Sequence, residues 1–146
     1  MKKAITVASI QMYVHRNKNK NIEQLKSHLI YLDRVLPQVK IVILPELSIS
    51  DIHREPQKQS QKVPGQLTSL FSSLAKKHGV WLIPGSIYEK SGNNTYNTAL
   101  VFSPKGELVG KYRKRYPWYP YEKTTPGREP IVFSIEGFGT IGLMVC

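Results

Sequence analysis

The sequence predicts a protein of the α/β class, built on a mixed sheet with helices packed on one or both of its faces. Two segments with apolar residues at helical spacing alternate with short apolar runs that are typical of buried strands. Strand-helix-strand crossings of this kind place strands parallel to one another. The later apolar runs are separated only by short turns and predict antiparallel pairs. Both kinds of pairing in one chain indicate a mixed sheet.

The first strand and the first helix are predicted from residue type and spacing. Residues 4–12, AITVASIQM, are rich in β-branched side chains, which favour a strand. Asn21 is expected to cap the helix that follows, with Gln24 three residues later, and Pro37 is expected to end it. The apolar stripe of this helix consists of Ile22, Leu25, Leu29, Leu32 and Leu36.

A second strand, a long loop and a second helix are expected next. Residues 41–47, IVILPEL, form an apolar run that suits a strand buried on both faces, and a carboxylate, Glu46, follows its proline. Residues 51–66 are polar and contain two prolines and a glycine, which predicts a long loop. The second helix is expected over residues 68–78, with Gly79 as its left-handed stop.

The remainder of the chain predicts strands joined by tight turns. We expect one continuous strand over residues 80–90, and a central strand over residues 140–146 that ends at Cys146. No internal repeat or interdomain linker interrupts the sequence, which predicts a single domain over residues 1–146. The other strands are expected at residues 97–103, 108–114 and 131–135.

Composition is that of a globular domain without a disulfide framework. The chain has 146 residues, 40% of them hydrophobic, which is enough apolar material for a core. No apolar run approaches the roughly 20 residues that span a bilayer, and the first residues lack the features of a signal peptide. We therefore expect a cytoplasmic protein with no membrane partner. The single cysteine, Cys146, is either a buried hydrophobe or a reactive thiol.

The formal charge of +11 raises the question of a polyanionic partner. Lysines and arginines are dispersed over most of the chain, as on an ordinary solvated surface, and only KYRKRY at residues 111–116 is concentrated enough to resemble a basic patch. We expect no nucleic-acid partner. The alternative is a binding module that uses the basic aromatic loop of residues 111–123 to stack on nucleic-acid bases.

Glu46 and Cys146 are candidate catalytic groups because each ends a predicted strand. Open α/β sheets bind their ligands at strand ends, so the two side chains could meet at one edge of the sheet. A cysteine thiol is mostly protonated at neutral pH, and a nucleophilic cysteine therefore needs a base or a cation beside it. Taken alone, Glu46 also fits a solvated glutamate beyond the sheet edge, and Cys146 an inert core residue.

A cation to assist the thiol is available in residues 111–127, which combine basic and aromatic side chains with Glu122 and two stiffening prolines, Pro117 and Pro120. A lysine held by a carboxylate is suited to stabilising a developing oxyanion. The four histidines show no spacing typical of metal ligands, and no glycine loop of the phosphate-binding kind is present. We therefore expect neither a metal nor a nucleotide cofactor.

Three motifs resemble the nitrilase superfamily of carbon-nitrogen hydrolases. They are LPEL at residues 44–47, YRKRYPWYPYEKTTPG at residues 112–127 and GLMVC at residues 142–146. Their order, spacing and residue types agree across the whole chain. The resemblance implies an αββα sandwich, of which residues 1–146 form the N-terminal part.

The resemblance also implies a Glu-Lys-Cys triad, which falls on Glu46, Lys114 and Cys146. Glu122 matches the second glutamate that the family places beside the triad. The pattern YRK-x-x-PW-x-P-x-E is most similar to the amidase branch, and it favours amides over nitriles as substrates. Within this pattern, Tyr116 and Trp118 are expected to bind or support the substrate.

The implied reaction converts a small amide to a carboxylic acid and ammonia through a thioester on Cys146. In it, Glu46 serves as base and acid, Lys114 stabilises the oxyanion and Glu122 holds Lys114. No cofactor is needed for these steps. Family members usually form dimers or larger assemblies, so the resemblance implies a homo-oligomer.

The sequence stops at Cys146, roughly halfway through a family member. Two explanations are open: a fragment, or a polypeptide that continues past a chemically modified Cys146, which we favour. A genuine 146-residue product is expected to be inactive, a non-catalytic remnant of a hydrolase, and to leave sheet surface exposed.

Overall fold

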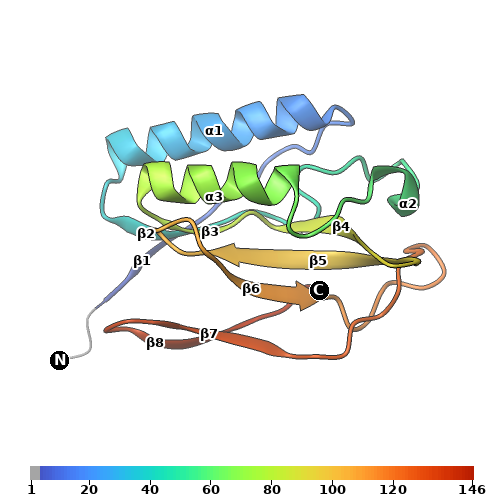
Figure 1. Ribbon diagram of the computed structural model, residues 1–146. Helices are drawn as coiled ribbons and strands as arrows, with labels where there is room; N and C mark the ends of the chain where they lie inside the picture. The colour runs from blue at the N-terminus through green and yellow to red at the C-terminus, as the bar shows by residue number, and fades with distance from the viewer. Residues whose placement is uncertain (1–3) are drawn as a thin grey trace.

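Three layers make up the protein, whose computed structural model describes residues 4–146 (Figure 1). The upper layer holds two long helices, α1 (Lys18–Val35) and α3 (Gln66–His78), which cover one face of a six-stranded sheet. A hairpin of β7 (Ile131–Ile135) and β8 (Gly139–Leu143) lies beneath the other face as a separate two-stranded sheet. The sequence predicts helices on one or both faces of the sheet, and among the described residues they cover one face.

The main sheet is mixed, as its sequence predicts. Strand β1 pairs in parallel with β2, and β2 in parallel with β3. Strand β5 runs antiparallel to β3 and β4 along one edge and to β6 along the other. The strands span Thr6–Ser9 (β1), Val39–Ile43 (β2), Trp81–Ile83 (β3), Ser86–Ser91 (β4), Asn94–Phe102 (β5) and Leu108–Arg113 (β6).

Helix α1 begins one turn earlier than its apolar stripe suggests. Asn17, rather than Asn21, is the N-cap, and its side chain accepts hydrogen bonds from the backbone N–H groups of Asn19 and Lys20. The prediction for Asn21 was wrong because the first turn, KNKN, is wholly polar and gives no hydrophobic signal. Asn21 is instead fully buried, and it exchanges two hydrogen bonds of 2.7 Å with the backbone of His15.

The single strand predicted over residues 80–90 is divided in two. Strand β3 ends at Ile83, and β4 starts at Ser86, because Pro84 has no N–H to donate and Gly85 turns the chain with a φ of 75°. The polar segment 51–66 also contains a short helix, α2 (Pro56–Gln59), where the sequence predicts only a loop.

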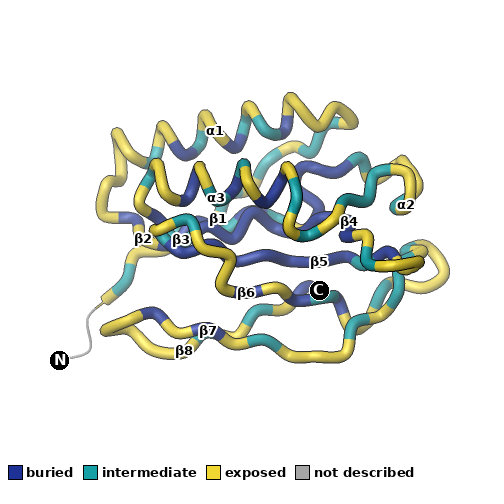
Figure 2. Tube along the Cα trace, in the orientation of Figure 1, coloured by how far each residue is buried: buried dark blue, intermediate teal, exposed yellow. Residues whose placement is uncertain are grey.

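The last strand is peripheral, and the prediction of a central strand over residues 140–146 was wrong. Strand β8 pairs with β7 alone. The hairpin buries only the side chains that face the main sheet, and much of its length is exposed (Figure 2). Val132 and Met144 are 66% and 80% exposed. An apolar run predicts a strand buried on both faces, whereas one face of this hairpin has no cover among the residues described.

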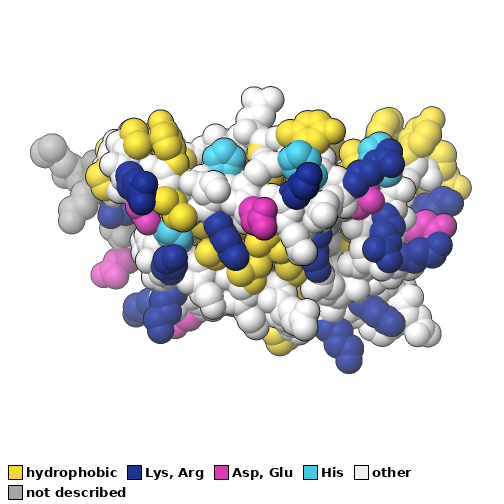
Figure 3. Space-filling model, turned by 90° about the horizontal axis from the view of Figure 1, so that it is seen from above, with side chains coloured by type: hydrophobic (Ala, Val, Ile, Leu, Met, Phe, Trp, Pro, Cys, Tyr) yellow, Lys and Arg dark blue, Asp and Glu magenta, His cyan; other side chains and the backbone are white. Residues whose placement is uncertain are grey.

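The helix face of the molecule carries its positive charge in dispersed form. Figure 3 looks down on the helix layer and shows Lys and Arg side chains scattered between acidic, histidine and neutral side chains. None of the helices within residues 4–146 combines the length and the hydropathy that a bilayer crossing requires.

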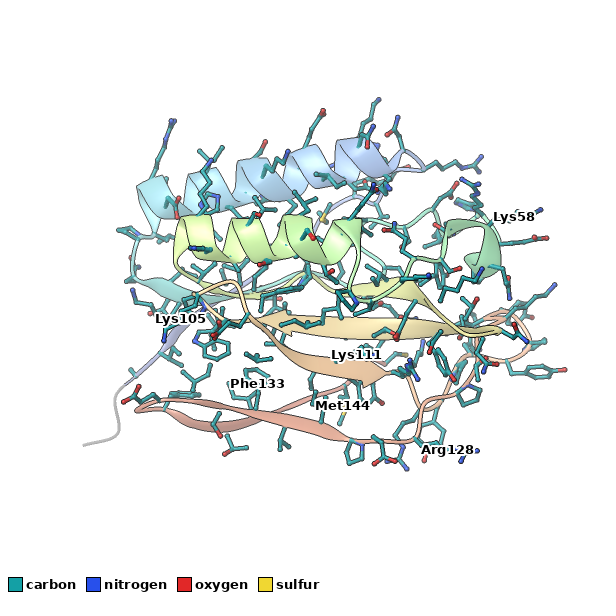
Figure 4. The ribbon with its side chains drawn as sticks, viewed as in Figure 1. Lys58, Lys105, Lys111, Arg128, Phe133 and Met144 are labelled. Atoms are coloured by element: carbon teal, nitrogen blue, oxygen red, sulfur yellow. The ribbon has the colours of Figure 1, made fainter. Side chains whose placement is uncertain are left out.

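Two apolar cores hold the layers together. Between the helices and the sheet, Phe71 of α3 packs against Phe102 of β5 with ring centroids 5.9 Å apart. Between the two sheets, Phe133 rises from β7 and stacks on Trp81 of β3 at 5.5 Å, in the space visible in Figure 4. The second core fixes the hairpin, and with it the path of the chain towards Cys146.

A buried carboxylate joins strands β4, β5 and β6. Glu89 is 1% exposed and accepts hydrogen bonds from Thr98, from Lys111 and twice from Arg113, all between 2.8 and 2.9 Å. Burial by itself would raise the pKa of Glu89, but the bonds from Arg113, Lys111 and Thr98 outweigh it and lower the pKa from 4.5 to about 2. The ionised glutamate therefore stabilises this part of the sheet.

Replacing this carboxylate by an amide should make the stability of the protein less dependent on acid. Because the folded-state pKa lies below the ordinary one, the stabilisation by Glu89 is complete above pH 4.5 and is lost as pH falls towards 2. We expect Glu89→Gln to lower the free energy of unfolding by about 3 kcal/mol at pH 7. Urea denaturation at a series of pH values should show the difference from wild type closing below pH 4.5.

The exposed Glu129→Gln is the matched control and should stay within about 0.5 kcal/mol of wild type at every pH. A difference for Glu89→Gln that does not change with pH would contradict the assignment.

Candidate active site

A buried lysine brings two distant glutamates together. The Lys114 ammonium donates to Glu46 Oε1 at 2.8 Å and to Glu122 Oε2 at 2.7 Å. Lys114 is only 3% exposed, and burial alone would lower its pKa. Hydrogen bonds to Glu122 and Glu46 reverse that effect and hold the pKa of Lys114 above its ordinary value. The lysine is thus a fixed positive charge at neutral pH.

The backbone on both sides of Lys114 is held by the sheet and by a returning loop. Its N–H donates to the carbonyl of Asn97 at 2.8 Å, and its carbonyl accepts from the N–H of Gly127 at 2.8 Å. A side chain at Gly127 would come within 2.2 Å of the Arg113 carbonyl oxygen, so only glycine lets the loop approach this closely. These contacts keep the ammonium at one place.

Glu122 is saturated with hydrogen bonds. Its Oε2 accepts from Lys114 and, at 3.2 Å, from the backbone N–H of Trp118. Its Oε1 accepts from the side chains of Asn97 at 2.8 Å and Thr124 at 3.3 Å. Burial would raise the pKa of Glu122, but the bonds from Lys114, Asn97 and Trp118 lower it overall. Glu122 is therefore an ionised anchor with little capacity left for proton transfer.

Glu46 has a different arrangement, with one oxygen held and one free. Oε1 accepts from Lys114 and also from Asn97 at 2.6 Å, whereas Oε2 has no hydrogen-bond partner within residues 4–146. The Glu46 side chain is 33% exposed, so the free oxygen is within reach of a ligand. A carboxylate fixed through one oxygen can exchange a proton through the other.

The turn that carries Glu46 is fixed by the break between β3 and β4. Leu47 follows with a φ of 53°, and its N–H donates to Ser86 Oγ at 3.0 Å. The Ser48 hydroxyl donates to the Pro84 carbonyl at 2.8 Å. The interruption at residues 84–85 therefore presents the groups that hold the Glu46 turn.

Cys146 lies in the same small cleft as Glu46. The cleft has a volume of about 160 Å³, and both residues line it together with Gly85 and Ala99. Val145 packs against Ala99 and Tyr112, which anchors the chain end beneath the sheet, while Cys146 itself is exposed. Glu46 and Lys114 are thus in direct contact, and Cys146 lines the same cleft as Glu46.

Comparison with known proteins assigns the chain to a family. A family model described as carbon-nitrogen hydrolase matches residues 6–146. The chain belongs to the carbon-nitrogen hydrolase family. This confirms the resemblance to the nitrilase superfamily that the three motifs indicated.

Relatives of this carbon-nitrogen hydrolase chain include two curated amidases. Omega-amidase NIT2 of Homo sapiens is 36% identical over 110 residues, which cover 74% of this chain and 39% of the relative. A formamidase of Bacillus cereus (strain B4264) is 32% identical over 114 residues, which cover 75% of this chain and 34% of the relative. The chain therefore spans well under half the length of these relatives.

The fold agrees with a solved structure of the same family. A carbon-nitrogen hydrolase from Helicobacter pylori G27 superposes with a TM-score of 0.83 and 32% identity, over 97% of this chain and 51% of that one. This confirms the predicted α/β class, with these residues corresponding to the N-terminal part of the related fold.

Two residues of the candidate site were not identified from the sequence. Asn97 of β5 contacts both glutamates, and Tyr88 of β4 is its cross-strand partner. Burial, together with the charges of Glu122 and Glu46, raises the pKa of Tyr88 to about 12, so its hydroxyl stays neutral. In the sequence, only the alternation of side chains along each strand could have indicated them, and that alternation locates a site only once the register between the strands is known.

The aromatic residues expected near the substrate lie at the surface of the loop after β6. Tyr116 and Trp118 are 76% and 70% exposed, and the Trp118 ring packs on Tyr121 at 4.8 Å. The contact of Trp118 with the site runs through its backbone N–H to Glu122. Their role towards substrate stays a prediction.

The basic segment 111–114 directs its charges inward. Lys111 and Arg113 pair with Glu89, and Lys114 pairs with the two glutamates. These cations already have carboxylate partners, and a phosphate backbone would have to compete with them. Residues 4–146 contain no cluster of three or more His, Cys, Asp or Glu side chains that could hold a metal ion.

A methyl group at Gly85 should disrupt the turn that carries Glu46. An added Cβ would lie 1.9 Å from the Pro45 carbonyl oxygen, and the φ of 75° is itself unfavourable for alanine. We expect Gly85→Ala to destabilise the protein by at least about 3 kcal/mol in urea denaturation. Gly92→Ala is the matched control: it has a φ of 58° with nothing within 4 Å and should cost about 1 kcal/mol. Equal losses for both variants would refute the close approach.

Proposed function

We propose that the protein hydrolyses a small amide to a carboxylic acid and ammonia, with Cys146 as nucleophile, Glu46 as base and acid, and Lys114 as the stabilising cation. The observation that carries the proposal is that Glu46, which keeps Oε2 free of hydrogen bonds, and Cys146 line the same cleft. Membership of the carbon-nitrogen hydrolase family supports the reaction class. The names of two relatives, an omega-amidase and a formamidase, support an amide as the substrate.

The first half of the reaction forms a thioester. Glu46 Oε2 takes the proton of the Cys146 thiol, and the sulfur attacks the amide carbon to form a tetrahedral intermediate. Of the three N–H bonds on the Lys114 ammonium, two serve the glutamates, and the third is left for the oxyanion. The carbon-nitrogen bond then breaks, and Glu46 returns its proton to the nitrogen, which leaves as ammonia.

The second half hydrolyses the thioester. Glu46 takes a proton from a water molecule, whose oxygen attacks the thioester carbon. The carbon-sulfur bond breaks, the carboxylic acid leaves, and the sulfur regains a proton from Glu46. Glu122 holds Lys114 throughout and does not exchange a proton, in line with its lowered pKa. All proton transfers use side chains of the chain, and the scheme requires no cofactor.

Three further features belong to this proposal. Tyr116 and Trp118 would bind or support the substrate through the loop after β6. A homo-oligomeric assembly and a cytoplasmic location remain predictions. The volume of about 160 Å³ in the cleft supports a substrate with a short acyl group.

Ammonia release from short amides tests the proposal. The assay uses the longest polypeptide expressed from the gene, with formamide, acetamide and an omega-amide of a dicarboxylic acid as substrates. We expect Cys146→Ala to lower kcat at least about 1000-fold, because no other group can form the acyl intermediate. Glu46→Gln should have an effect of similar size.

Ser134→Ala, on the exposed face of β7, is the control and should retain wild-type activity. A polypeptide of these 146 residues alone is expected to be inactive. Equal ammonia release by wild type and Cys146→Ala would rule the mechanism out.

A further inference from the structure

Asn97 occupies the centre of the site but takes no part in the chemistry just described. It lies on β5, which runs through the middle of the sheet (Figure 1), and it is fully buried. Its carbonyl accepts from the N–H of Lys114, and Tyr88 is its partner across β4. Strand pairing on both sides therefore fixes the Asn97 backbone relative to the ammonium.

The side-chain amide of Asn97 donates both of its N–H groups to the two glutamates. Nδ2 donates to Glu46 Oε1 at 2.6 Å and to Glu122 Oε1 at 2.8 Å. The orientation of the amide follows from these partners, because the flipped amide would set its oxygen against two carboxylate oxygens. Asn97 thus joins the same pair of carboxylates that Lys114 joins.

The other end of the amide is left without compensation. Asn97 Oδ1 is buried and has no hydrogen-bond partner within residues 4–146. An unpaired buried acceptor costs desolvation free energy that an apolar side chain would avoid. The favourable contribution of Asn97 therefore comes from the two hydrogen bonds that its Nδ2 donates to the glutamates.

A neutral donor has one effect that a second lysine would not have. Glu46, Glu122 and Lys114 together carry two negative charges and one positive charge. An amide holds the carboxylates in place and leaves one net negative charge on the cluster. The amide thus holds both carboxylates without adding a second positive charge to the cluster.

We propose that Asn97 is a positioning residue: it fixes Glu46 through Oε1 so that Oε2 faces the cleft and Cys146. The inference rests on the proposed function for Glu46 and Cys146. Without the amide, Glu46 keeps only its bond to Lys114 and can rotate about it, which moves Oε2 out of line with the thiol.

The test compares Asn97→Leu with Thr98→Val. The first variant keeps the approximate shape and removes both donors. The second is the matched control, because Thr98 is equally buried on the same strand but points to the other face, where it bonds Glu89. Circular dichroism checks that both variants fold. If Asn97→Leu does not fold, Asn97→Ser replaces it, and the same result is expected.

The first measurement does not need a substrate. The rate at which iodoacetamide alkylates Cys146 at pH 7 is followed by mass spectrometry of the peptide that contains it. We expect the rate to fall about 10-fold in Asn97→Leu and to stay within about 2-fold of wild type in Thr98→Val. An unchanged rate in Asn97→Leu, or an equal fall in both variants, overturns the inference.

The second measurement uses amide turnover. For Asn97→Leu we expect kcat to fall about 10- to 100-fold with KM within about 3-fold, and the acidic limb of the kcat/KM profile to move to higher pH, because the ionised carboxylates lose a donor. A rise in KM alone overturns the positioning role. If wild type releases no ammonia but the alkylation rates differ as expected, the proposed function fails and the role of Asn97 stands. If wild type and Asn97→Leu turn over amides equally well, the proposed function stands and the role of Asn97 fails.

Discussion

The buried ammonium of Lys114 is the charge on which the arrangement of the site depends. An ammonium removed from water needs carboxylate partners that hydrogen-bond it, because burial alone favours loss of its proton. Here two carboxylates provide the pairing, one from the turn after β2 and one from the loop after β6. The same lysine therefore stabilises the loop after β6 and orients the carboxylate of Glu46, which is proposed as the base. Loss of the lysine would leave two neighbouring carboxylates without their cation, so folding and chemistry share this constraint.

The fold meets the constraint with adjacent strands. The Lys114 backbone, one residue beyond β6, pairs with Asn97, and Asn97 faces Tyr88. One row across the sheet therefore delivers three polar side chains to one face. The opposite face of the same strands carries the cluster around Glu89. Each face thus holds a hydrogen-bonded acidic group, and the two differ in one respect. Glu89 is buried and saturated with donors, whereas Glu46 is partly exposed and keeps one oxygen free.

Sequence reasoning succeeded where a single segment carries the signal. Helical stripes and apolar runs predicted both long helices and most strands, and motifs pointed to Glu46 and Lys114, which are in contact. It failed where the answer depends on pairing between segments. Whether β8 joins the main sheet or only β7 depends on strand pairing that its own residues do not specify. The contact of Asn97 with the site follows only from the register of β5 against β6. The cap at Asn17 escaped because its helix turn is wholly polar.

The most direct measurement for the central claim is the titration of the Lys114 side chain by nitrogen-15 NMR, with the carboxyl carbons of Glu46 and Glu122 observed in parallel. A buried ammonium held by two carboxylates should give a slowly exchanging signal at neutral pH and should keep its proton to a pH above the ordinary lysine pKa of 10.5. Its deprotonation should shift both glutamate carbons together. A Lys114 that exchanges freely with water, titrates below 10.5 or leaves either glutamate carbon unmoved would contradict the account.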